Sequence, residues 1–300
     1  MIKNIQLYED FLYKNESIKF SYNINNNKVE IIYLNVLNKP SFLKFNYEYN
    51  DNMYIITNLI YGEEIQYIKS DLKYIFLFIS DILFNKDYCL LQFEKEIYDL
   101  IIFNNIFKKY NFNTELLENN IIKLNNKQNI LSYSYVIDKL KNCKVDDIII
   151  ENWHHQNFTY ICKLEDKNFD ENRILNLCES TGFYADYEVK FNIINRHIIK
   201  QVDDINPIFR GFGWGYKCYL RLIKELDYID SPLDRRKTIF SQGLWNKLFK
   251  DSSIYTIDKG QIGIAINKKL SDDKIIEILK KINFDISYKH NIPQKIINKI

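Results

Sequence analysis

The chain has 300 residues, 46% of them hydrophobic and 27% charged, which is enough apolar material for one large core or two smaller ones. Its 41 Lys and Arg residues nearly balance its 39 Asp and Glu residues, and no segment is a basic block, so the charge pattern does not favour nucleic acid as a partner. Five cysteines without a Cys-x-x-Cys pair argue against a disulfide framework and a zinc knuckle, and are typical of reduced thiols in a cytoplasm.

The N-terminal sequence MIKNIQLYED lacks the apolar stretch of a secretory signal. The most apolar helix candidate, at 72–84, has 13 residues and contains Lys73 and Asp81, so it is too short and too charged to span a bilayer. We therefore expect a cytoplasmic protein without a membrane span.

The first 60 residues alternate between apolar and polar positions in short runs separated by Asn-rich turns, which predicts an antiparallel meander. Helices are expected at 68–84 and 93–110, and a strand near 146–155. We place a domain boundary in the Lys- and Asn-rich stretch, giving an α+β unit at 1–145 and a second domain at 146–300.

In the second domain the pattern predicts strands within 158–166, 185–194 and 197–205, and helices at 169–180 and 214–226. An irregular, helix-containing insertion is expected at 227–250, followed by strands within 253–267, a helix from Ser271 and a last strand at 284–290. Ser271 is a suitable N-cap residue, and acidic residues follow it. The predicted fold class is α/β (α+β), with a mixed, mainly antiparallel sheet flanked by helices.

The two halves contain one short pair of similar segments. The segments FKKYNF (107–112) and LKKINF (279–284) each close a predicted helix and open a predicted strand. The similarity is open to two interpretations, an ancient duplication or a coincidence in a chain rich in Lys and Asn.

Glycine is scarce, with eight residues in the chain, yet Gly211, Gly213 and Gly215 alternate in the sequence FRGFGWG before an apolar-periodic run. Glycine permits positive φ and close approach of the backbone to a ligand, and the N-terminus of the following helix favours an anion such as a pyrophosphate. The simpler alternative is a tight structural turn. The spacing fits neither the Rossmann fingerprint G-x-G-x-x-G nor a Walker A loop, which needs Gly-Lys-Ser/Thr.

The phrase INPIFRGFGWG (205–215) and the run after it resemble the acyl-CoA-binding motif of the GNAT superfamily of N-acyltransferases. The family pattern is an aliphatic residue, any residue, Pro, any residue, Tyr or Phe, and then Arg-Gly-x-Gly-x-Gly or Ala. The residues that match it are Ile205, Pro207, Phe209, Arg210, Gly211, Gly213 and Gly215. The resemblance covers about 156–290 and implies a splayed sheet that grips the pantetheine arm between two central strands.

The resemblance also implies which residues bind acyl-CoA as co-substrate. The loop amides would hold the pyrophosphate, the strand before the loop would pair with the pantetheine amides, and Lys217 or Arg221 would reach a phosphate. The implied cofactor-binding residues are Val202, Ile205, Arg210, Gly211, Phe212, Gly213, Trp214, Gly215 and Lys217. Trp214 has the alternative of packing in the core. No metal is expected, because the adjacent His154 and His155 would point to opposite faces of a strand and have no ligand partner nearby.

The implied reaction is direct attack of an amine on the thioester, which needs a base for the amine and an acid for the thiolate. Asp203 and Asp204 are the candidate bases, with solvated strand-end carboxylates as the alternative, and Glu188 is a weaker candidate. Many family members use a tyrosine as the acid, but Leu279 stands at the corresponding position. Tyr288, or Tyr255 on the preceding predicted strand, could take its place, and the sequence does not choose between them.

The function implied is N-acyl transfer from acyl-CoA to a small-molecule or peptide amine. The alternatives are a GNAT-like module that binds acyl-CoA or a protein without catalysis, and an unrelated domain in which the Phe-Arg-Gly tripeptide is fortuitous. Residues 1–145 would be a degenerate GNAT-like unit or an accessory domain.

Overall fold

A computed structural model describes residues 21–34, 40–61, 74–103, 107, 112–126, 130–153, 158–164, 169, 174, 187–194, 196–202, 207–232, 239–260 and 262–300. The chain divides into two compact units, and each is built from several segments. Unit 1 comprises Met1–Lys141, Asp166–Tyr187 and Asn206–Phe212. Unit 2 comprises Asn142–Glu165, Glu188–Ile205 and Gly213–Ile300. The predicted boundary at 145–146 stays a prediction.

Unit 1 contains a seven-stranded sheet in the order β1-β2-β3-β4-β5-β7-β6. Its strands are β1 (Ser21–Asn25), β2 (Lys28–Leu34), β3 (Pro40–Asn50), β4 (Met53–Tyr61), β5 (Tyr88–Phe93), β6 (Asn113–Leu117) and β7 (Ile121–Asn125). The first four form the predicted antiparallel meander, with Asn-rich turns at positive φ, and β4 pairs with β5 in parallel.

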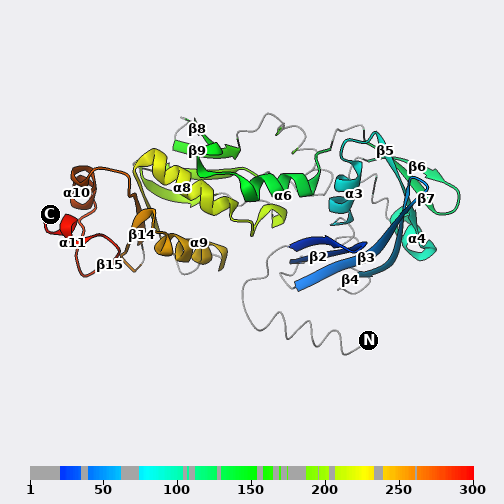
Figure 1. Ribbon diagram of the computed structural model, residues 1–300, viewed down its shortest axis with the longest axis horizontal. Helices are drawn as coiled ribbons and strands as arrows, with labels where there is room; N and C mark the ends of the chain where they lie inside the picture. Colours follow the sequence, from blue (N-terminus) through cyan, green and yellow to red (C-terminus); the bar gives the residue numbers. More distant parts are fainter. Residues whose placement is uncertain are drawn as a thin grey trace, which may run out of the picture. The chain divides into compact units, whose positions relative to one another are not determined.

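The helices of unit 1 are α3 (Ile75–Leu83), α4 (Lys95–Phe103) and α6 (Tyr133–Asn142). Helix α3 lies across one face of the sheet (Figure 1), where Phe78 packs edge to face against Phe45 of β3 at 5.3 Å between ring centroids. Almost every residue of α3 is buried, which explains why this segment is so apolar although it is too short to cross a bilayer.

Unit 2 contains an eight-stranded sheet in the order β15-β13-β14-β12-β11-β10-β9-β8. Its strands are β8 (Ile148–Trp153), β9 (Phe158–Leu164), β10 (Val189–Ile194), β11 (Ile198–Val202), β12 (Tyr228–Pro232), β13 (Ile254–Asp258), β14 (Ile262–Asn267) and β15 (Lys289–His290). The predicted mixed, mostly antiparallel arrangement with flanking helices is confirmed, since β11 and β12 are the one parallel pair in the described part of this sheet.

The helices of unit 2 are α8 (Trp214–Leu226), α9 (Ile239–Lys250), α10 (Asp272–Lys281) and α11 (Gln294–Ile297). Tyr219 of α8 contacts both Phe191 of β10 and Trp245 of α9, so α8 and α9 pack together over one face of the sheet. Helix α10 begins as predicted, because the Ser271 hydroxyl accepts a hydrogen bond from the Lys274 amide, and Leu279 is buried in its core cluster.

The prediction of an irregular, helix-containing insertion at 227–250 was right about the helix, which is α9, but wrong about the start, where strand β12 begins two residues after α8 ends. The strand has five residues, of which Asp230, Ser231 and Pro232 gave no apolar alternation to follow. The predicted helix at 169–180 lies outside the described residues apart from Phe169 and Ile174.

The two units follow the same plan in the elements that the structure describes. In each, four antiparallel strands lead through a helix (α3 or α8) to a parallel fifth strand, and a second helix (α4 or α9) precedes an antiparallel hairpin. Seven strands have the same order, 1-2-3-4-5-7-6, and a third helix, α6 or α10, follows the seventh strand in both, while β15 adds an eighth strand to the sheet of unit 2. The similar segments 107–112 and 279–284 lie at non-equivalent places in this plan, so they do not support a duplication. The shared topology of the two units is a separate observation that does.

No helix in the described part of the chain combines the length and the apolar character needed to cross a membrane.

Candidate functional site

The glycine phrase joins β11 to α8, and the division between the units falls inside it, between Phe212 and Gly213. On the unit 1 side, Ile208 and Phe209 are fully buried and the Tyr133 hydroxyl donates a hydrogen bond of 2.6 Å to the Ile208 carbonyl oxygen. Gly211 and Gly213 have φ values of 88° and 83°. This left-handed conformation is costly for residues with a Cβ atom, which explains the two glycines.

Helix α8 begins without a capping side chain, because Gly213 is its N-cap residue. Its first internal bond runs from the Lys217 amide to the Gly213 carbonyl oxygen at 3.2 Å. A Cβ atom placed on Gly213 would meet no heavy atom within 4 Å, so there is open space beside the start of the helix. No acidic residue occupies the first turn. The first turn itself therefore supplies no negative side chain to the positive end of the helix dipole.

The sheet opens beside this helix start. Among the described residues, one register pair joins β11 to β12, Ile198 with Asp230, whereas the neighbouring pairs β12–β14 and β10–β9 each extend over five residues. Both strands run away from this pair toward the end of β11 that leads into the glycine turn. The opening therefore faces the start of α8, since a crossover helix begins at the carboxyl end of the first parallel strand.

A β-bulge distorts β11 at the same place. Asn192 of β10 pairs with Gln201 and Ile193 pairs with Ile199, so Lys200 is the extra residue. A bulge bends its strand and increases the local twist. The bulge gives a physical reason for the divergence of β11 from β12.

Unit 1 shares part of this geometry at the equivalent position. Its parallel strands β4 and β5 pair over four residues, from Met53 with Leu90 to Ile56 with Phe93, and β4 then continues to Tyr61 with a register shift against β3. Helix α3 follows Tyr74 in the ordinary helical conformation, not a glycine at positive φ, and its first turn is buried. The comparison therefore singles out unit 2 by its glycine turn and by the shorter pairing of its central parallel strands.

Both residues of α8 that were predicted to bind a phosphate, Lys217 and Arg221, instead form hydrogen bonds with backbone carbonyl oxygens that hold α8 in place. The Lys217 ammonium donates to the Cys143 carbonyl oxygen at 2.7 Å. Arg221 donates to the Ile148 carbonyl oxygen at 3.0 Å and pairs with Glu225. Trp214 is 1% exposed, so its indole packs in the core while its backbone stays in the first turn.

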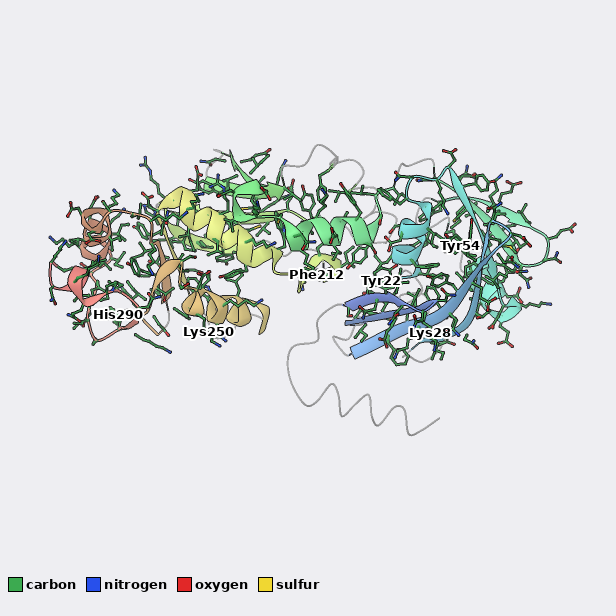
Figure 2. The ribbon with its side chains drawn as sticks, viewed as in Figure 1. Tyr22, Lys28, Tyr54, Phe212, Lys250 and His290 are labelled. Atoms are coloured by element: carbon green, nitrogen blue, oxygen red, sulfur yellow. The ribbon has the colours of Figure 1, made fainter. Side chains whose placement is uncertain are left out.

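The candidate acid Tyr288 lies away from the opening. It precedes β15, at the edge of the sheet where Figure 2 labels His290, and β13, β14 and β12 intervene before β11. Four neighbour spacings correspond to about 19 Å. The half-buried Tyr288 ring packs against the α10 core cluster, with the Lys259 ammonium 5.3 Å from its centroid.

Of the candidate bases, Glu188 lies in the described part of the chain and the two aspartates do not. Asp203, Asp204 and Ile205 lie outside the described residues, as do His154 and His155, while Val202 ends β11. Glu188 is buried and lies 3.4 Å from the Lys163 ammonium and 3.6 Å from that of Lys190, so it belongs to an ion-pair cluster.

A half-buried carboxylate missed by the sequence analysis lies at the closed end of the opening. Asp230 is the β12 member of the single pair with β11, and it lines a pocket of about 250 Å³ together with His197, Ile198, Tyr228, Lys281 and Ile282. Burial raises the pKa of Asp230, and Lys259 partly opposes the shift. Asp230 could have been found from the sequence only if residues 228–232 had been predicted as a strand beside β11.

Among the described residues, no group of three or more His, Cys, Asp or Glu side chains is arranged to hold a metal ion. The four described cysteines, Cys89, Cys143, Cys162 and Cys218, are free thiols. In comparisons with protein-family models, curated proteins and solved structures, nothing matches this chain.

Proposed function

We propose that unit 2 binds acyl-CoA and transfers its acyl group to an amine. The observation that carries the proposal is the opening of the sheet beside the glycine turn. In the part of these strands that the structure describes, one register pair joins β11 to β12, and the strands diverge toward the start of α8, where Gly213 has no side chain to cap the helix. The GNAT resemblance of residues 205–215 implies a pantetheine arm between two central strands, and the opening has the place and direction that such an arm requires.

The pyrophosphate would lie at the start of α8. The backbone N–H groups of the first turn have no intrahelical acceptor, and Gly213 supplies no side chain to cap them. An anion bound there would gain from these donors and from the helix dipole. Lys217 and Arg221 bond to carbonyl oxygens, so in this proposal the backbone amides contribute more of the anion binding than the sequence suggested.

The pantetheine arm would lie along the bulged strand β11. Where a strand has lost its neighbour, its N–H and C=O groups are available to an extended ligand, as in peptide binding by strand addition. The short link between α8 and β12 also removes a departure from the family, since the sequence had suggested an insertion of about 25 residues there.

A module that binds acyl-CoA without turnover is the second candidate. Two observations favour it. A buried leucine, Leu279, stands where the family has its acidic tyrosine, and Tyr288 lies four strands away from the opening, too far to protonate the thiolate. Release of free CoA in the presence of an amine would exclude this candidate.

We propose further that unit 1 is a second copy of the same fold without a cofactor site. The shared order of seven strands supports the common fold, and the buried first turn of α3, which follows Tyr74 and not a glycine at positive φ, supports the missing site. Unit 1 would then contribute structure and not an acyl-CoA site.

Calorimetric titration tests the proposal. We expect acetyl-CoA to bind with a dissociation constant of roughly micromolar order. Pantetheine and 3′,5′-ADP, which carry the two halves of the molecule, should each bind at least about tenfold more weakly. NADH serves as control, because it has a pyrophosphate but no pantetheine. Absence of binding by the folded protein, or equal affinity for NADH, would contradict the proposal.

A further inference from the structure

The pocket at the closed end of the opening has a definite place in the sheet. Two of its lining residues, Ile198 and Asp230, are the pair that holds β11 and β12 together. The others come from the residue before β11, the start of β12 and the end of α10. The pocket therefore begins where the opening ends.

The position matters because of where a bound thioester would end. An arm whose pyrophosphate lies at the start of α8 and which follows β11 back from Val202 to Ile198 covers four residue rises, about 13 Å. Its far end, which carries the thioester, would arrive beside Ile198 and the pocket. An acceptor held in the pocket would meet the acyl group at this point.

The pocket is lined by an acidic, a basic and two aromatic side chains. Asp230 provides a half-buried carboxylate on β12. His197 stacks on the Tyr228 ring at 4.0 Å between centroids, and its Nδ1 atom is buried without a hydrogen-bond partner among the described residues. The exposed Lys281 extends over the same ring, with its ammonium 5.6 Å from the centroid.

These groups point to the kind of molecule that fits. A carboxylate favours a bound ammonium, and a lysine at the rim favours an acidic group on the same ligand. The volume of about 250 Å³ is small for a ligand pocket, which limits the acceptor to few non-hydrogen atoms. An amine that also carries a carboxylate, such as a free amino acid, satisfies both charges.

We infer that this pocket binds the acceptor, a small amino acid-like amine, and that Asp230 takes the proton from its nitrogen. The inference rests on the proposed acyl-CoA function. The Asp230 carboxylate accepts a proton from the ammonium, and the free amine attacks the thioester carbon. A C–N bond forms and the C–S bond breaks. The thiolate of CoA leaves and is protonated by solvent, the second amine proton is released to water, and Asp230 returns its proton to solvent before the next turnover. Burial, which raises the pKa of Asp230, makes it a better proton acceptor than an exposed aspartate.

The test measures release of CoA thiol from acetyl-CoA with a panel of α-amino acids, the matching amino amides and the matching decarboxylated amines. We expect amino acids to be acetylated at least about tenfold faster, as kcat/KM, than their amides or amines. Asp230→Asn should lower kcat about 100-fold or more while calorimetry finds its affinity for acetyl-CoA unchanged. Asp273→Asn, an exposed change on α10, is the matched control and should have no effect.

Lys281→Gln gives a second, exposed variant that does not depend on the buried carboxylate. It should raise the KM for the amino acid about tenfold and leave that for the matching amide unchanged, whereas Lys280→Gln should change neither. If acetyl-CoA binds but no panel amine is acetylated, or if Asp230→Asn retains wild-type kcat, the acceptor pocket is wrong and the cofactor site stands. If acetyl-CoA does not bind at all, both proposals fall.

Discussion

A Gly213→Glu variant should bind acetyl-CoA at least about 100-fold more weakly than the wild-type protein, as measured by calorimetry. The new carboxylate would enter the open space at the start of α8, where the pyrophosphate is proposed to lie. Two negative groups at this position repel each other, and like-charge juxtaposition costs several kcal/mol. A factor of 100 corresponds to about 2.8 kcal/mol.

Gly260→Glu is the matched control. Gly260 has φ of 82°, close to the 83° of Gly213, and a Cβ atom there would also meet nothing within 4 Å. The change adds the same charge and similar backbone strain, but in the turn between β13 and β14. Equal loss of affinity in the two variants would mean that strain or net charge, and not the position at α8, weakens binding.

An Asp81→Ala variant should lower the free energy of unfolding by about 3 kcal/mol or more, measured by urea denaturation with circular dichroism. Asp81 of α3 accepts four hydrogen bonds within unit 1, from the hydroxyls of Tyr22, Ser132 and Ser134 and from the Ser134 amide. Figure 2 shows Tyr22 near α3. The bonds tie β1 and the start of α6 to α3, and alanine would leave these donors without their acceptor.

Asp99→Ala provides the comparison for this stability effect. Asp99 is exposed on α4, and we expect its replacement to change the free energy of unfolding by about 0.5 kcal/mol or less. If the Asp81 variant were as stable as the Asp99 variant, the network would be a set of solvated contacts without net stabilisation.

The sequence predicted the regular parts of the fold because their patterns are local. The alternation in the first 60 residues predicted the meander, and the run after the glycines predicted α8 over 214–226, the bounds that the structure has. The capping signal at Ser271 predicted the start of α10. In each case the residues that determine the element lie within it or next to it.

The topology could not be predicted in the same way, because it depends on pairing between distant segments. Strand β12 is stabilised by β14, which lies about 30 residues later, and its own five residues show no strand pattern. Without β12 there is no parallel pair, no opening and no reason to consider Asp230. The repeat between the units was equally hidden, since it lies in the order of the strands and not in a shared segment of sequence.

Hydrogen exchange with and without acetyl-CoA tests the central claim most directly. The account predicts slower exchange for the amides of β11, Ile198–Val202, and for the first turn of α8 when the ligand is added, because the arm and the pyrophosphate would bond to them. Strands β4 and β5 of unit 1 should exchange at the same rate in both conditions. Unchanged exchange in β11 at saturating ligand, or protection of β4 and β5 in its place, would contradict an acyl-CoA site in the opening of unit 2.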